Sequence, residues 1–187
     1  MSTLIPDLLK NLSFGVRDSD VSDRDRLEAR KSAYPDKTDW KEYQERGAIA
    51  QWIVGLVLDC PLYADENKFW LGDFWLKDLI IEVKFKPDPN RPLSLNAPVA
   101  ESIMGMYNKS NQQISEMREF HENMERHYIL WVYCPGDVYR PYVAIKTSEL
   151  KSHMFTELKN RRTGEKYYKI DERRVPQEAI FKYTEEK

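Results

Sequence analysis

Residues 68–85, KFWLGDFWLKDLIIEVKF, decide the fold because they predict two β-strands, each of which carries charge inside an apolar run. The second part, Leu79–Phe85, is rich in β-branched and aromatic residues, as buried strands are. Glu82 and Lys84 interrupt it, and both side chains point to one face because strand side chains alternate with a period of two. Charge on a buried strand is costly unless it is paired or binds an ion. This stretch therefore predicts both a sheet and a site.

A turn at residues 77–78 is expected to join the two strands. In that register Trp75 lies opposite Ile80, and Asp73 lies opposite Glu82. Directly opposed residues lie about 5 Å apart on one face of the sheet. The two carboxylates would repel each other, so the pattern predicts a divalent cation between them.

The predicted cation is Mg²⁺, for which Mn²⁺ is expected to substitute. Mg²⁺ prefers hard oxygen ligands and keeps several of its waters, so Asp73, Glu82 and the backbone carbonyl of Val83 suit it. Lys84 lies on the same face of the strand. Its amine is expected to orient or activate a bound water and to neutralise charge that develops on a phosphate.

Asp73, a short gap and then Glu82-Val83-Lys84 on a strand resemble the PD-(D/E)xK nuclease superfamily, which has the restriction-endonuclease-like fold. Gly72 stands where members often have Pro, at a loosely held position. The resemblance implies an α/β fold with an αβββαβ core, in which helices flank a mixed central sheet. It also implies metal-dependent hydrolysis of phosphodiester bonds in DNA.

A purely structural alternative treats Gly72-Asp73 as an ordinary turn and places Glu82 and Lys84 on the wet face of an edge strand. Bulky aromatic residues flank Gly72 on both sides and favour a continuous strand instead.

A helix over residues 38–58 is expected to pack on the sheet through an apolar stripe of Ile49, Trp52, Ile53, Leu56 and Val57. Glu45 lies at the edge of this stripe. The run Glu45-Arg46-Gly47-Ala48 is similar to the E-x-x-A of many superfamily members, which implies a glutamate that assists the metal site. A surface charge is the alternative for Glu45. Glu42 is the fallback candidate, although it also fits as the acidic partner of a capping box.

The length of 187 residues predicts a single domain over 1–187. Its core is expected at 38–146, with an N-terminal helical extension at 1–37 and a C-terminal basic addition at 147–187. The net charge of −2 excludes a chain that is basic throughout, so any contact with a polyanion depends on local positive charge.

The two cysteines, Cys60 and Cys134, are too few for a disulfide framework, and no Cys/His cluster indicates zinc. They are expected to be free thiols in a reducing compartment. No signal peptide or membrane-spanning run is found, so a cytoplasmic location without membrane contact is expected.

The remaining elements follow from periodicity and turn residues. We expect a charged helix at 22–33, which serves as a solvated face or a dimer arm, and a proline-rich loop at 86–98. A long helix is expected at 98–126, either continuous or broken near residues 108–111, with His121 and His127 in its final turns. Strands at 128–134 and 140–146, a short helix at 148–155, a hairpin at 158–170 and a returning segment at 175–183 are expected to follow.

Nucleic-acid contacts are expected near the site and in the basic C-terminal part. Between Lys151 and Arg174 the chain has eight Lys or Arg against four Asp or Glu, which is typical of a polyanion-binding surface, although a soluble basic hairpin is an alternative. The resemblance implies a Gln or a basic residue in the helix that follows the Glu-x-Lys strand. The candidates are Lys86, Arg91, Lys109, Gln113, Arg161 and Arg162.

Together these patterns predict a magnesium-dependent DNA endonuclease of the restriction, homing or repair type that acts on double-stranded DNA as a homodimer. Two alternatives stay open. The first is a structure-specific junction resolvase or an exonuclease with the same site. The second is a non-catalytic nucleic-acid-binding module on the same fold.

Overall fold

A computed structural model describes residues 5–62, 72–88, 90–106 and 118–184 of the chain. Its elements in chain order are α1 (Asp7–Lys10), β1 (Val16–Arg17), α2 (Asp23–Ala33), α3 (Glu42–Leu58), β2 (Phe74–Leu76), β3 (Leu79–Lys86), β4 (Ser94–Asn96), α4 (Ala97–Ile103), β5 (His127–Tyr133), β6 (Val138–Lys146), β7 (Phe155–Lys159), β8 (Lys166–Ile170) and β9 (Ile180–Lys182). Within the described ranges, no helix is long and apolar enough to cross a bilayer.

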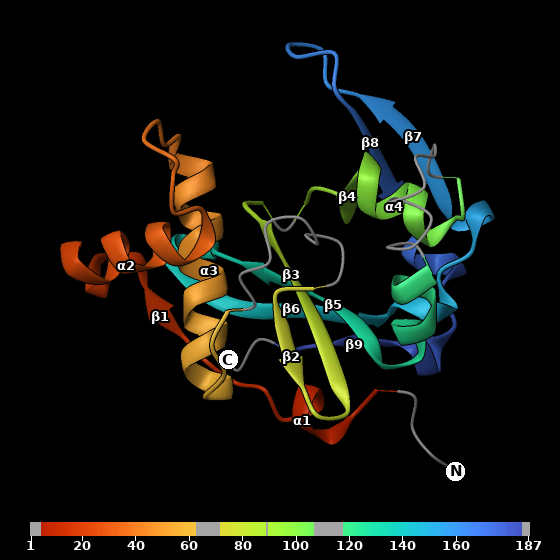
Figure 1. The fold of residues 1–187 in the computed structure, drawn as a ribbon, viewed down its shortest axis with the longest axis horizontal. Helices are drawn as coiled ribbons and strands as arrows, with labels where there is room; N and C mark the ends of the chain where they lie inside the picture. Colours follow the sequence, from red (N-terminus) through yellow and green to blue (C-terminus); the bar gives the residue numbers. More distant parts are fainter. Residues whose placement is uncertain (1–4, 63–71, 89, 107–117, 185–187) are drawn as a thin grey trace.

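The main sheet has the strand order β1-β6-β5-β3-β2, and β9 also pairs with β6 (Figure 1). β3 runs antiparallel to β2 and parallel to β5, so the sheet is mixed. β1 and β9 pair with the same edge of β6 at different points along it. A second, antiparallel sheet has the order β4-β8-β7, and its β7–β8 hairpin projects from the body of the molecule.

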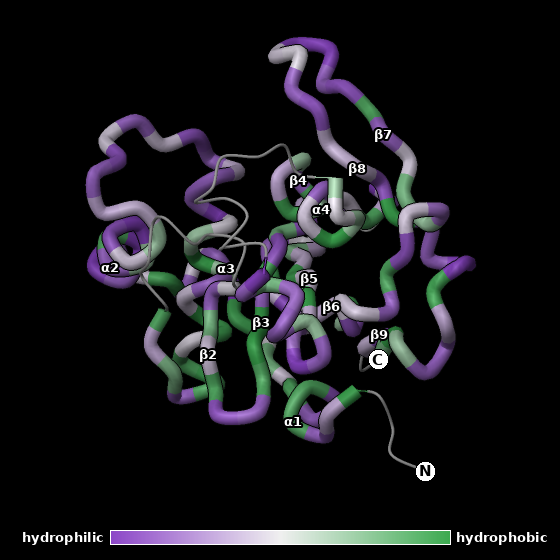
Figure 2. The backbone as a smooth tube through the Cα atoms, turned by 45° about the vertical axis from the view of Figure 1, so that its right-hand side comes forward, coloured by the Kyte–Doolittle hydropathy of each residue, from purple (hydrophilic) through white to green (hydrophobic). Residues whose placement is uncertain are grey.

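Each face of the main sheet has its own apolar core. Odd-numbered residues of β3, such as Ile81 and Val83, pack with α1, α2 and α3. The opposite face packs against α4, β4 and β8, and Ile129 and Trp131 of β5 belong to that core. Figure 2 shows the hydrophobic central strands inside the molecule and a largely hydrophilic turn at the end of the β7–β8 hairpin.

The predicted α/β class with a mixed sheet and flanking helices is confirmed. The predicted hairpin register is confirmed for Trp75 and Ile80, which pair across the turn at 77–78. The predicted continuation of the strand through Gly72 is wrong, because β2 begins at Phe74 and Gly72 has a φ of +97°, outside the extended region. The helix at 22–33 starts after Ser22, whose hydroxyl accepts from the Asp25 N–H as an N-cap. The C-terminal hairpin and the returning segment are present as β7–β8 and β9.

Several predicted boundaries are wrong for local physical reasons. α3 begins at Glu42 instead of near Thr38, because Lys41 is its N-cap and the Lys41 N–H donates to the side chain of Gln44 at 3.4 Å. The helix predicted at 98–126 is not continuous, since α4 ends at Ile103 and Gly105 has a φ of +69° just beyond it. The break allowed near residues 108–111 lies outside the described residues.

Three further corrections concern the connections. The loop expected after β3 contains the short strand β4, which pairs with β8. The helix expected at 148–155 is replaced by two 3₁₀ turns, Thr147–Glu149 and Ser152–Met154. His127 begins β5 instead of ending a helix. At His127, pairing with Ile80 of β3 outweighed local helix propensity.

Candidate active site

Asp73 is held at the end of β2 by three hydrogen bonds. The β2–β3 ladder ends at the pair Phe74 and Ile81, one residue before the position at which Asp73 would face Glu82. The Asp73 N–H donates to the Ile81 carbonyl at 2.8 Å. Its carboxylate accepts from the Val83 N–H at 2.6 Å and from the side-chain amide of Gln51 at 3.0 Å. The carboxylate is therefore fixed beside β3 and tied to α3.

Glu82 and Lys84 project from β3 toward the α4 side of the sheet. Their parallel partners on β5 are Ile129 and Trp131, and paired residues of neighbouring strands share a face. Glu82 is only 3% exposed. One of its oxygens forms an ion pair with the Lys84 ammonium, whereas the other, Oε2, is buried and has no hydrogen-bond partner among the residues that the structure describes. An orphaned carboxylate oxygen in a protein interior needs an explanation.

The charges at this point are strongly coupled. Burial raises the pKa of Asp73, and the neighbouring Glu82 raises it further, to about 8, although Lys84 and the two hydrogen bonds act in the opposite direction. Burial alone lowers the pKa of Lys84, but Glu82 and Asp73 outweigh burial and raise it. Two acids and one amine thus act electrostatically on one another, and the Asp73 carboxyl favours its protonated form.

The carbonyl of Val83 is directed toward the same region. The N–H and C=O of one strand residue point to the same side of the strand, and the Val83 N–H points at Asp73. Two carboxylates and this carbonyl form the kind of oxygen-donor set that Mg²⁺ prefers. Within the described residues, no group of three His, Cys, Asp or Glu side chains is placed to hold a metal. The candidate metal ligands therefore include two acidic side chains, Asp73 and Glu82, and no third among the described residues.

Glu45 and Glu42 have other partners. Glu45 accepts from the guanidinium of Arg30 at 2.6 Å, and Arg26 lies 3.8 Å away, so its carboxylate joins α3 to α2. Glu42 is exposed and pairs with Arg46 at 3.5 Å. The ion-pair partners of both carboxylates thus lie on the helices α2 and α3.

The candidate nucleic-acid contacts are distributed over two places. Lys86 lies on β3 two residues beyond Lys84, and it lines a surface hollow together with Arg91. Arg161 and Arg162 lie in the exposed turn of the projecting β7–β8 hairpin. Lys109 and Gln113 lie outside the described residues.

Three residues near the site were not predicted from the sequence. Gln51 of α3 donates a hydrogen bond to the Asp73 carboxylate. Its position next to the apolar stripe of α3 is the feature of the sequence from which this contact could have been predicted. Tyr34 follows α2, and the charges of Lys84, Asp73 and Glu82 all act on its phenol, whose pKa burial raises. The N-terminal extension, predicted as a solvated face or a dimer arm, thus approaches the acidic pair.

The third unpredicted residue is His127, at the start of β5. Its Nδ1 lies 2.7 Å from the Thr147 hydroxyl, and its buried Nε2 has no hydrogen-bond partner within the described part of the chain. Burial, and secondarily the charge of Lys84, lowers the pKa of His127 to about 3, so the ring is neutral. Because His127 was predicted at the end of a helix, its position on the same face of the sheet as Glu82 was not expected.

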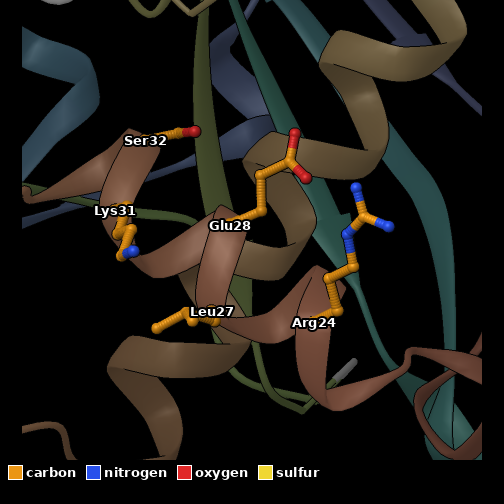
Figure 3. A pocket seen from close by; sticks show the side chains of 5 residues that line it. All are labelled: Arg24, Leu27, Glu28, Lys31 and Ser32. Atoms are coloured by element: carbon orange, nitrogen blue, oxygen red, sulfur yellow. The ribbon is translucent and has the colours of Figure 1, made fainter.

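A second hollow, on α2, offers no comparable chemistry. Its volume is about 380 Å³, and it is lined by one helix through Arg24, Leu27, Glu28, Lys31 and Ser32 (Figure 3). Its charges have both signs, and no pair of carboxylates converges there. It is best described as the solvated face of a surface helix.

Comparisons with known proteins add no identification: no family model, curated protein or solved structure gives a significant match to this chain.

Proposed function

We propose that this protein is a magnesium-dependent DNA endonuclease that hydrolyses phosphodiester bonds. The observation that supports this function best is the pair Asp73 and Glu82, two electrostatically coupled carboxylates with a buried, unpartnered oxygen and an amine beside them. A structural ion pair alone does not require the second acid or leave an oxygen unsatisfied.

The residues present fit a divalent cation. Asp73, Glu82 and the Val83 carbonyl would hold it, and Mn²⁺ is expected to substitute for Mg²⁺. When bound, such an ion supplies a water of lowered pKa and stabilises negative charge on a phosphate. Gln51 and the Val83 N–H fix the Asp73 carboxylate beside β3, each through a hydrogen bond to one of its oxygens. Glu45 is omitted from the proposed ligand set because its carboxylate is bound to Arg30.

Lys84 is the proposed catalytic cation. Its ammonium forms an ion pair with a Glu82 oxygen, and this contact holds the Lys84 side chain on the reacting face of β3. From there it orients the attacking water and balances the charge that grows on the phosphate oxygens. Cleavage of both strands of a duplex requires two such sites, so a homodimer is part of the proposal.

A plasmid-nicking assay tests this function. Wild-type protein is expected to nick supercoiled DNA with Mg²⁺ and to be inactive in EDTA. Asp73→Asn and Lys84→Met are each expected to lower the cleavage rate by about 100-fold or more, because each removes a group that acts on the reacting phosphate. Glu42→Gln is the matched control, since it removes an exposed carboxylate on α3 and leaves the site intact.

Two outcomes would overturn the proposal: cleavage that persists in EDTA, or full activity in either variant. Calorimetric titration with Mn²⁺ separates an enzyme from a non-catalytic binding module. Metal binding that Glu82→Gln abolishes supports the enzyme. Branched and linear DNA substrates, compared in the same assay, distinguish an endonuclease from a junction resolvase or an exonuclease.

A further inference from the structure

A hollow of about 470 Å³ opens beside the candidate site, at the carboxyl end of β3. It is lined from β3 by Lys86, from the following loop by Arg91, from β6 by Tyr142 and from β8 by Lys169. The hollow thus joins the main sheet to the second sheet. Its walls come from segments that are far apart in the sequence. The hollow therefore differs from a cluster of surface lysines that lie on one element.

Lys86 is an unusual cation because it is only 4% exposed. Its ammonium lies 4.1 Å from the centroid of the Tyr142 ring, a cation–π contact that holds it at the wall of the hollow. Burial lowers the pKa of Lys86. In the described part of the chain, no carboxylate lies within ion-pairing distance of it. Glu172 and Asp88 act on this ammonium without forming an ion pair with it, and they raise its pKa against the effect of burial. A buried ammonium without an ion-pair partner favours an anionic ligand.

The carboxylates that line the hollow are already paired. Asp171 binds Arg173 at 3.0 Å, and Glu172 binds Lys182 at 2.9 Å. Three cations, Lys86, Arg91 and Lys169, have no ion-pair partner among the residues that the structure describes. The hollow therefore carries a local positive excess on a chain whose net charge is −2.

The hollow is aligned with the acidic pair. Lys86 follows Lys84 by two residues on the same face of β3, which corresponds to about 6.6 Å along the strand. A phosphate at Lys84 and an anion at Lys86 would therefore occupy neighbouring positions. Lys169 of β8 continues the positive surface away from the sheet.

We infer that this hollow binds the phosphodiester backbone of the substrate strand next to the bond that is cleaved, with Lys86 and Lys169 as its phosphate contacts. The inference rests on the proposed nuclease function for the identity of the substrate. Contacts of this kind position a strand without reading its bases, so binding through the hollow is independent of sequence.

The test measures binding of a fluorescein-labelled DNA duplex in EDTA at several salt concentrations. Asp73→Asn serves as the uncleaving parent. Adding Lys86→Met or Lys169→Gln is expected to weaken binding by about threefold to tenfold on any sequence. Each lost phosphate contact also lowers the slope of log affinity against log salt by about 0.9. Lys169→Gln keeps the test valid if Lys86→Met does not fold, because Lys169 is exposed.

Lys31→Gln is the control, since Lys31 lines the hollow on α2 and carries the same charge. Equal losses in the Lys31, Lys86 and Lys169 variants would indicate a nonspecific charge effect and overturn the inference. Unchanged affinity and salt slope in both hollow variants would overturn it as well, even if the wild-type protein cleaves DNA. If the wild-type protein does not cleave DNA but the hollow variants still bind it more weakly, the proposed nuclease function is wrong and the inferred phosphate-binding site is supported.

Discussion

Asp73 gives the metal-free protein a specific pH dependence. Its pKa is about 8 in the folded state and near 3.8 when unperturbed. A carboxyl group with a raised pKa binds its proton more tightly in the native state, so native stability falls as the pH rises from about 4 to about 8. Bound Mg²⁺ competes with that proton, and metal affinity is therefore expected to rise over the same range.

Replacing Asp73 by Asn removes this titration. In EDTA, the loss of unfolding free energy between pH 5 and pH 8 is expected to be smaller in Asp73→Asn than in the wild type by at least about 1.4 kcal/mol, the equivalent of one pKa unit. Urea unfolding followed by circular dichroism at both pH values measures the difference. Parallel pH profiles for the two proteins would mean that Asp73 titrates like an exposed carboxyl.

Gly72 is required by geometry rather than by flexibility. Its φ is +97°, and a Cβ at this position would lie 2.5 Å from the Cγ2 atom of Ile80. Proline, which fixes φ near −65°, cannot occupy the site. The proline that the resemblance to the PD-(D/E)xK superfamily would favour at this position is therefore incompatible with the backbone.

Gly72→Ala is expected to destabilise the protein by about 2–4 kcal/mol, because it combines backbone strain with a clash against β3. Gly105→Ala is the matched control, since Gly105 also has a positive φ but open space around it. Its expected cost is about 1–2 kcal/mol. Thermal unfolding of both variants gives the comparison, and equal costs would contradict the predicted clash.

At the scale of single residues, the sequence indicated the acidic pair and the amine because strand periodicity alone places Glu82 and Lys84 on one face. Asp73 was predicted to pair with Glu82, but the β2–β3 ladder ends one residue earlier, at the pair Phe74 and Ile81. His127 and Gln51 were not found, because their proximity to the site depends on the pairing of β5 with β3 and on how α3 packs, and neither is a local property.

At the scale of elements, the contact between α2 and α3 depends on Glu45. Its ion pairs with Arg30 and Arg26 join the two helices. Glu45→Gln is expected to lower the unfolding free energy by about 1–3 kcal/mol and to change the nicking rate by less than about twofold. Urea unfolding and the plasmid assay measure the two quantities.

Glu42→Gln is again the control, because its side chain is 83% exposed and its pairing with Arg46 contributes little. A large loss of nicking with unchanged stability in Glu45→Gln would instead assign Glu45 to the metal site, as the E-x-x-A resemblance implies.

Element types were more predictable than element ends. β5 was recognised from its continuous apolar run and β3 from its β-branched residues. The start of α3 was misplaced because several residues between 38 and 42 are acceptable caps, and only the Lys41–Gln44 contact distinguishes them. β4 was missed because its three residues form a strand only by pairing with β8, more than seventy positions later.

At the scale of the whole molecule, the mixed α/β class followed from alternating helical and strand patterns, but the division into two sheets did not. Three short strands, β1, β4 and β9, are defined by their partners rather than by their own sequences. The hollow beside Lys86 exists because both sheets meet there, so no sequence window contains its signal.

The parallel pairing of β3 with β5 has a consequence for how the protein folds. Residues 87–126 lie between these strands, so the pair forms only after a long loop has closed at an entropic cost. The β2–β3 and β5–β6 hairpins have no such requirement. Proteins dominated by distant pairings fold slowly. During refolding, the circular-dichroism signal of the helices should therefore return first. Asp73 and Glu82 should become buried well after that, when β5 pairs with β3.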